Sequence, residues 1–203
     1  MDPAHQITPP PLQMMAPGVF EIGQVRIFKR EGKVEFPCQV NMQKGLLEYA
    51  IVGNFGKVHE SLLRTHVEPY SLQIALLLLG LEGTTNPLVM QGDPRKPEGS
   101  PVTLWVQWKE GEQVKKARIE DWIINQQDGA VMKSTQWIFT GSVVANGVFM
   151  AQTEKSIVAV FHDPVALIDN PLQEGASDKI WFVNDKTVPA AGTEVIVIIQ
   201  KET

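Results

Sequence analysis

Beyond residue 18 the chain consists of short apolar runs cut by Gly, Pro, Asn and Asp. Runs of this length with such boundaries are typical of β-strands joined by turns. In residues 102–108 apolar side chains alternate with polar ones, which predicts a strand with one buried face. Strands are predicted at 20–23, 25–28, 34–40, 47–52, 102–108, 137–139, 148–152, 157–161, 180–183 and 194–199.

One helix interrupts this pattern. Ser71 is suited to cap its N-terminus, residues 72–79 form its body, and Gly80 ends it. Apolar residues lie nearly all round this helix, which predicts deep burial against a sheet. The predicted fold class is therefore α+β, a predominantly antiparallel β-sheet with one buried helix at about 71–80 packed on it.

Several shorter features complete the prediction. A weaker helical pattern covers residues 119–125, and residues 83–99 read as a long loop because they are rich in Pro, Gly and Asn. Hairpin turns are predicted at 29–33 and at 145–147, where Asn-Gly accepts positive φ.

The length of 203 residues suits one domain with a sizeable core. Residues 1–17 hold five prolines and few large apolar residues, so they are predicted to be a Pro-rich extended tail. Residues 18–203 are predicted to form a single domain.

Charge and cysteine content exclude several classes of function. The 23 acidic and 18 basic residues give a net charge of −5, whereas nucleic-acid binding requires a concentrated basic face. Cys38 is the only cysteine, so neither an intrachain disulfide nor an iron–sulfur cluster held by cysteines can form. It sits in an alternating run, which favours a buried, small apolar role.

Two observations concern the membrane. The longest apolar run, residues 74–79, is far shorter than the roughly 20 residues of a membrane-spanning helix, so no transmembrane segment is expected. The first residues lack a basic and an apolar region, so no signal leader is expected in this chain.

The densest polar segment is residues 53–61, which contains His59 and Glu60. A His-Glu-x-x-His zinc motif fails because Leu63 stands where the second histidine belongs. His59, Glu60, His162 and Asp163 could still converge on a divalent metal and form a hydrolase site. Alternatively, His59 and Glu60 bond to neighbouring backbone and only fix the entry to the helix.

No catalytic residue is assigned. Ser142 could form a triad with His162 and Asp163 only if the fold brings them together, and a serine in a turn is the simpler interpretation. The candidate binding residues are His59, Glu60, Thr65, His66, Thr140, Ser142, His162 and Asp163, with His59, Glu60 and His162 as the possible metal ligands.

These segments together resemble the YdjY-domain family of bacterial proteins. The resemblance is carried by Phe36-Pro37, Val40-Asn41, Leu47-Glu48-Tyr49, Gly56-Lys57-Val58-His59-Glu60-Ser61-Leu62, the helix at 75–80, Trp137 with Thr140-Gly141-Ser142, and Pro189 with Gly192-Thr193-Glu194-Val195. It extends over most of residues 19–200 and implies one YdjY-like domain in 18–203.

The resemblance implies an extracytoplasmic protein of bacteria, in the periplasm or cell envelope, and brings no activity with it. The expected function is a binding or accessory domain without catalysis and without a cofactor. Its partner is expected to be an unidentified protein or small ligand. The alternative remains the metal-assisted hydrolase built on His59, Glu60, His162 and Asp163.

Overall fold

The computed structural model describes residues 10–202, of which strands are the main element. Strands make up 40% and helices 13% of the structure. The strands are β1 (Leu12–Ala16), β2 (Val19–Ile22), β3 (Val25–Phe28), β4 (Lys33–Val40), β5 (Tyr49–Gly53), β6 (Ser61–Thr65), β7 (Ser100–Glu110), β8 (Gln113–Arg118), β9 (Ile123–Asn125), β10 (Trp137–Phe139), β11 (Val144–Ala145), β12 (Val148–Phe149), β13 (Ser156–Ala159), β14 (Ile168–Asp169), β15 (Trp181–Val183) and β16 (Glu194–Lys201). The helices are α1 (Pro69–Leu78) and α2 (Met150–Glu154), with 3-10 turns η1 (Val58–Glu60), η2 (Ile119–Trp122) and η3 (Gln173–Ala176).

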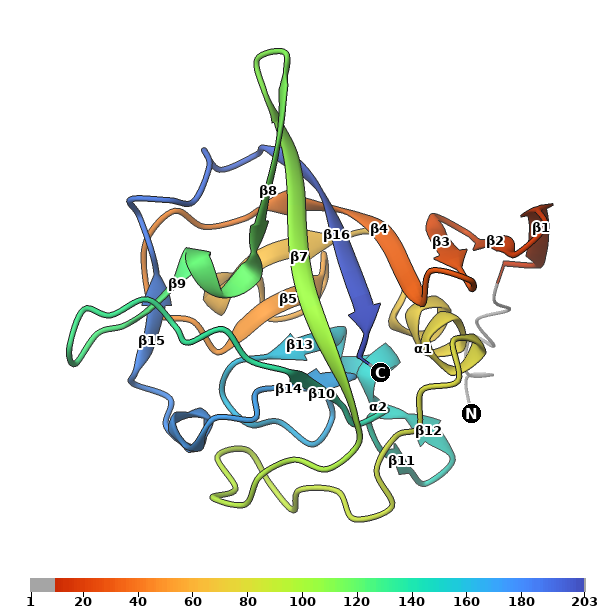
Figure 1. The fold of residues 1–203 in the computed structure, drawn as a ribbon. Coiled ribbons are helices and arrows are strands. Elements are labelled where there is room, and N and C mark those ends of the chain that lie inside the picture. The colour runs from red at the N-terminus through yellow and green to blue at the C-terminus, as the bar shows by residue number, and fades with distance from the viewer. Residues whose placement is uncertain (1–9, 203) are drawn as a thin grey trace.

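Eight strands form a closed barrel. Their order is β4, β16, β7, β10, β14, β13, β5 and β6, and pairing of β4 with β6 closes the circle. The long strands β7 and β16 run side by side through the middle of the molecule (Figure 1). The β5–β6 and β13–β14 pairs are parallel, while the other barrel pairs are antiparallel.

The predicted α+β class is therefore wrong, because the protein is a mostly β closed barrel with extra strands. Alternation along β4 correctly marks one buried face, but an open sheet and a barrel show the same alternation. Closure depends on the pairing of Val40 with Leu63 and of Gln39 with Arg64. Strand β6 was not among the predicted strands, so its pairing with β4 was not foreseen.

Helix α1 is a small addition to this barrel rather than a layer of the fold. It begins earlier than predicted, since Pro69 occupies the first turn, and it ends as expected before Gly80, whose φ is +77°. The helix packs on β3 and α2, while Leu77 is 49% exposed. The expectation of burial on all sides is thus wrong for its outer face.

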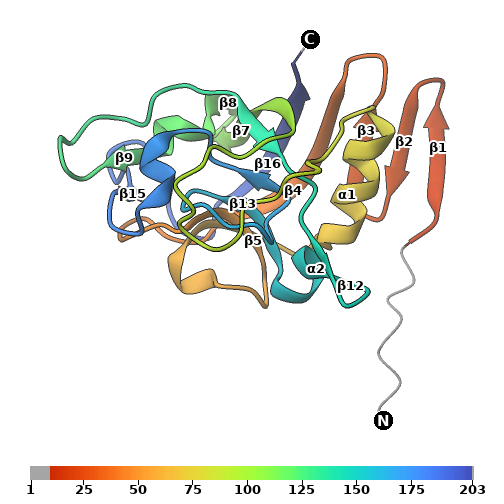
Figure 2. The same cartoon turned by 90° about the horizontal axis from the view of Figure 1, so that it is seen from below.

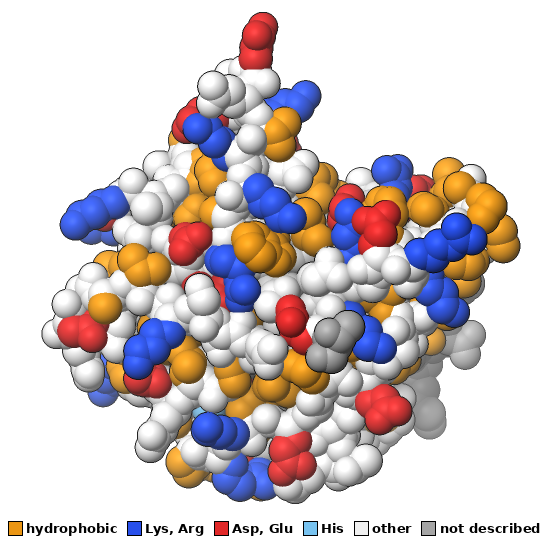
Figure 3. All heavy atoms as spheres, viewed as in Figure 1, with side chains coloured by type: hydrophobic (Ala, Val, Ile, Leu, Met, Phe, Trp, Pro, Cys, Tyr) orange, Lys and Arg blue, Asp and Glu red, His pale blue; other side chains and the backbone are white. Residues whose placement is uncertain are grey.

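Strands β1 to β3 extend the sheet outward from β4 and form an arm beside α1 (Figure 2). Within the residues expected to be an extended tail, 12–16 form the outermost strand, β1, and residues 1–9 lie outside the described part. Leu12, Met14 and Met15 on β1 are exposed, and apolar side chains gather at this end of the molecule (Figure 3).

Other local predictions met mixed outcomes. The turn at 145–147 is confirmed, with positive φ at Asn146 and Gly147 between β11 and β12. The segment 119–125 is a 3-10 turn followed by strand β9, which pairs with β15. Residues 148–152 are a strand only as far as Phe149, and the rest belong to α2.

The core fills the barrel with large side chains. Phe36, Trp122, Trp137 and Phe139 are fully buried, and Cys38 is buried as predicted. Among the described residues 10–202, no helix is long and apolar enough to cross a membrane.

Candidate functional site

Three polar side chains from distant parts of the sequence meet at one side of the barrel. Tyr49 comes from β5, Lys57 from the turn before η1, and Asp163 from the loop after β13. The Tyr49 hydroxyl lies between the other two groups, 2.6 Å from Asp163 Oδ2 and 3.0 Å from Lys57 Nζ. We call these three residues the Tyr49 cluster.

The Tyr49 hydroxyl makes every hydrogen bond available to it. It donates to Asp163 and accepts from Lys57 Nζ and from Gln91 Nε2, the last at 3.0 Å. Burial and the neighbouring Asp163 carboxylate raise the pKa of Tyr49 far above its ordinary value. The Tyr49 side chain is therefore neutral, and its hydroxyl positions Asp163, Lys57 and Gln91 by hydrogen bonds.

A hollow of about 250 Å³ opens beside this cluster, next to the end of α2 and the start of β13. One buried group in its wall has no partner. Ser156 is 1% exposed, and its hydroxyl lies near that of Tyr49 but makes no well-formed hydrogen bond within the described residues. The lining residues are Lys57, Gln91, Met150, Glu154, Ser156, Asp163, Pro164 and Val165.

His162 fixes the loop that carries Gln91. Its ring is fully buried, with Nδ1 2.7 Å from the carbonyl oxygen of Asp93 and Nε2 2.9 Å from that of Asn170. Gly175 packs so closely on the ring that a Cβ there would lie 2.4 Å from Nε2. Both ring nitrogens are thus engaged by backbone, and His162 holds the loop in place.

Hydrogen bonds between Asp93 and Arg95 stabilise the same loop. The Asp93 carboxylate accepts bonds from the Arg95 guanidinium, at 2.8 Å from Nη2, and from the backbone N–H groups of Val89 and Arg95. Arg95 and these N–H groups hold the pKa of Asp93 well below its ordinary value. Gln91 therefore reaches Tyr49 from a firmly tied loop.

A second buried carboxyl group, that of Asp169, holds the backbone at Asp163. Asp169 accepts the backbone N–H of Asp163 at 3.0 Å and that of Asn170 at 2.7 Å. Burial raises the pKa of Asp169, and the charge of Asp163 adds to this, although the two N–H groups act in the opposite direction. Asp169 thus fixes the backbone that carries Asp163.

His59 lies on the surface at η1, whereas the neighbouring Glu60 side chain is only 18% exposed. The His59 side chain is 77% exposed, with Nε2 3.5 Å from Glu60 Oε2. Partial burial and the charge of Glu60 raise the pKa of the adjacent Glu48. Within residues 10–202, no three His, Cys, Asp or Glu side chains form a group that could hold a metal ion. The structure thus does not gather His59, Glu60, His162 and Asp163 into one metal-binding set.

Thr140 and Ser142 bind the backbone of the loop that follows Asp163. Thr140 Oγ1 donates to the carbonyl of Ala166 at 3.0 Å, and Ser142 Oγ donates to that of Val165 at 2.7 Å. With its hydroxyl on Val165, and with the His162 nitrogens on other carbonyls, Ser142 does not form a triad with His162 and Asp163.

Thr65 and His66 lie elsewhere, at a larger hollow of about 460 Å³ over β4 and β6. Thr65 Oγ1 donates to the carbonyl of Pro37, and the Asn54 amide contacts the His66 ring at 2.8 Å. Arg64 donates to the Gln39 side chain, which itself donates to Glu194. Because these polar groups already pair with one another, this hollow leaves fewer hydrogen-bond donors and acceptors free for a ligand than the hollow beside the Tyr49 cluster does.

Of the residues predicted for a site, the structure places only Asp163 in the wall of the smaller hollow. The sequence analysis missed Tyr49, Lys57, Gln91 and Ser156. A signal existed for two of them: Lys57 lies in the polar segment 53–61, and Tyr49 places a hydroxyl in an otherwise apolar strand. Gln91 and Ser156 stand in segments without any such signal.

Comparison with known proteins identifies the domain. No curated protein and no solved structure matches the chain. The family model described as the YdjY domain matches residues 25–200, which include β3 to β16 almost entirely and every residue of the Tyr49 cluster. Since this match covers most of the sequence, the chain belongs to the YdjY-domain family.

Proposed function

We propose that this domain binds a small polar molecule in the hollow beside the Tyr49 cluster and does not catalyse a reaction. The observation that carries the proposal is the hollow itself, whose wall brings the polar side chains of Lys57, Gln91 and Asp163 together with an apolar wall. The apolar lining residues are Met150, Pro164 and Val165.

The surrounding contacts support binding rather than proton transfer. Tyr49 makes all three of its hydrogen bonds, and Asp163 accepts from Tyr49 and from the backbone N–H of Val165. Because their hydrogen bonds are already made within the protein, Tyr49 and Asp163 form a rigid wall of the hollow. The hollow of about 250 Å³ has the liquid volume of about eight water molecules, which suits a small ligand.

An NMR titration of the isotope-labelled domain tests this proposal. The probes are chemically distinct small molecules: neutral polyols, carboxylates, amines and amino acids. At least one class is expected to shift the backbone resonances of residues around the hollow, with saturation. Lys57→Met should weaken that binding, whereas Lys116→Met, which removes a cation on β8, should not. If no class shifts these resonances, the proposal is wrong.

The proposal includes a location outside the cytoplasm, which rests on the family resemblance. Fractionation of the source bacterium with an antibody against the domain tests this part. Recovery with the periplasmic or envelope fraction is the expected result, and recovery with the cytosol would contradict it.

A further inference from the structure

Two opposite charges line the hollow of the proposed function without reaching each other. Lys57 and Glu154 both contribute to its wall. Within residues 10–202, neither side chain forms an ion pair at 4.0 Å or less, although eight such pairs occur elsewhere. Neither charge is therefore neutralised by a direct ion pair, although Lys57 lies close enough to Glu48 for its charge to oppose the rise in the pKa of that carboxyl.

The position of Lys57 leaves part of its ammonium group open to a ligand. One N–H bonds to the Tyr49 hydroxyl, and the charge lies 5.2 Å from the centre of the Tyr49 ring. An ammonium has three N–H donors, so two remain. These two donors suit a carboxylate.

Glu154 is the group in the wall of the hollow that would attract a positive charge of the ligand. It is the last residue of α2, its side chain is exposed, and its carboxylate makes no ion pair at 4.0 Å or less within the described residues. The Asp163 carboxylate is less open, because it already accepts from Tyr49 and from Val165. Glu154 is thus the acceptor best placed for an ammonium group, while Met150, Pro164 and Val165 offer an apolar wall.

We propose that the ligand is a small zwitterion of the free amino acid class. Its carboxylate lies against Lys57, its ammonium group faces Glu154, and its side chain lies against Met150 and Val165. This inference rests on the proposed function and goes further by naming the chemistry of the ligand. A zwitterion matches both unpaired charges, whereas a simple anion or cation matches one and is repelled by the other.

The experiment compares L-alanine with propionate, which lacks the ammonium group, with ethylamine, which lacks the carboxylate, and with glycerol, which carries neither. Binding of each probe is followed by NMR on the intact domain, and the other common amino acids are then ranked in the same way. An amino acid is expected to bind at least about tenfold more tightly than propionate or ethylamine, as an additional ion pair of moderate strength would provide.

Two charge-removing variants locate the contacts. Lys57→Met and Glu154→Gln are each expected to weaken amino acid binding about tenfold. Glu154 is exposed, so its replacement keeps the test valid even if Lys57→Met impairs folding. Glu112→Gln, in the β7–β8 turn, serves as the control and should leave binding unchanged.

The outcomes separate this inference from the proposed function. If propionate, ethylamine or glycerol binds at the hollow as tightly as every amino acid, the hollow is a binding site but the zwitterion assignment is wrong. If no amino acid shifts the resonances around the hollow, the assignment is also wrong. Binding that Glu154→Gln leaves unchanged would contradict the placement of the ammonium group.

Discussion

The Tyr49 hydroxyl donates a 2.6 Å hydrogen bond to the Asp163 carboxylate, and the two residues are 114 positions apart in the sequence. Tyr49 lies on β5 and Asp163 follows β13, and these two strands are neighbours in the barrel. The bond therefore ties the barrel wall to the loop that forms the hollow. The predictions below test this and other contacts that hold the site in place.

Tyr49→Phe is expected to lower the free energy of unfolding by about 1–3 kcal/mol, because it removes one of the donors to the buried Asp163 carboxylate. Urea denaturation followed by tryptophan fluorescence measures the effect. Tyr70→Phe is the matched control, since Tyr70 on α1 is 38% exposed and its loss should change stability by about 0.5 kcal/mol or less. Equal effects of the two variants would contradict the assigned role of Tyr49.

The two histidines named for a metal site should behave differently on truncation. His162→Ala removes a fully buried ring that contacts the carbonyl groups of Asp93 and Asn170, and it is expected to cost about 2–4 kcal/mol. His59→Ala removes an exposed side chain and should change stability by about 0.5 kcal/mol or less. Chemical denaturation of both variants measures the difference.

Loosening of the loop provides a second measurement on the same pair. His162→Ala should expose the bond after Arg95 to trypsin, since His162 holds the backbone at Asp93. His59→Ala should be cleaved there no faster than the unmodified protein. Fast cleavage of both, or of neither, would contradict the role of His162.

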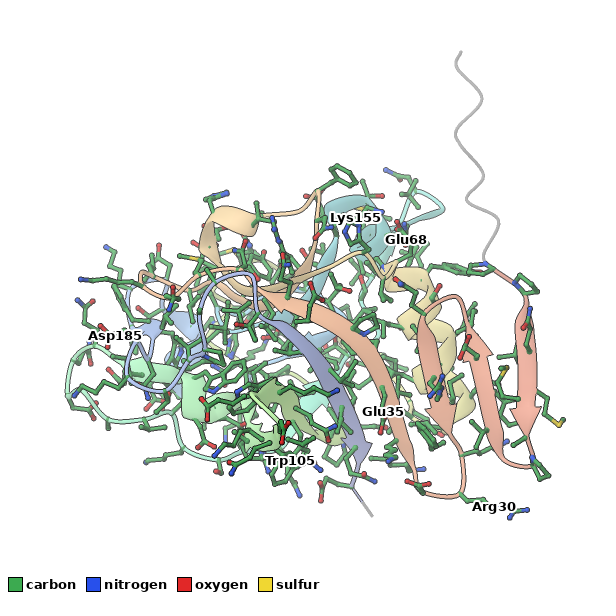
Figure 4. All side chains as sticks on the ribbon, turned by 90° about the horizontal axis from the view of Figure 1, so that it is seen from above. Arg30, Glu35, Glu68, Trp105, Lys155 and Asp185 are labelled. Carbon is green, nitrogen blue, oxygen red and sulfur yellow. The ribbon has the colours of Figure 1, made fainter. Side chains whose placement is uncertain are left out.

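The ion pair between α1 and α2 predicts a specific dependence on pH. Glu68, just before α1, bonds to Lys155 and to Gln152, and Figure 4 shows Glu68 and Lys155 side by side. Burial acts to raise the pKa of Glu68, but the bonds to Lys155 and Gln152 outweigh it and lower the pKa. A lowered pKa adds stability that is present above the unfolded value of about 4.3 and is lost as the pH falls through the folded value.

Glu68→Gln should therefore lower stability near neutral pH and have little effect at strongly acidic pH. The side chain is 44% exposed, so solvent screening limits the expected loss to about 0.5 kcal/mol. Melting temperatures of both proteins between acidic and neutral pH measure this. A difference that grows as the pH falls would have the wrong sign.

Arg118 and Glu120 form a buried ion pair at 2.6 Å near the β7–β8 hairpin, and Glu120 is fully buried. Arg118→Met is expected to cost about 3–5 kcal/mol, because it leaves a buried carboxylate without its cation. Lys116→Met is a matched control, since both cations lie over the Trp105 ring, at 4.9 Å for Lys116 and 5.2 Å for Arg118. Its expected cost is about 0.5–1 kcal/mol, measured by urea denaturation.

Parts of the fold followed from local sequence. The alternation in residues 34–40 and 102–108 identified the two long strands β4 and β7, and Gly80 marked the end of α1. The buried state of Cys38 was also predicted correctly. These features depend on residues that are neighbours in the chain, so the sequence shows them directly.

The site was harder to predict because its members have ordinary sequence surroundings. His59, Glu60 and His162 drew attention as chemically versatile residue types, yet His59 lies on the surface, Glu60 contacts only His59 as an ion-pair partner among the described residues, and His162 binds backbone. Lys57 carries the open donors of the hollow, but lysine is common on protein surfaces. Only its bond to the Tyr49 hydroxyl and its place in the wall of the hollow distinguish it.

By itself the sequence determined several of the strands, among them β4 and β7, where the helix ends, and that the chain resembles the YdjY-domain family, which the family match confirms. Tertiary structure decided that the strands close into a barrel and that Tyr49, Lys57 and Asp163 meet at one hollow. The reason is physical. Alternation shows which face of a strand is buried, but the partner of each strand is chosen by packing between segments far apart in the chain.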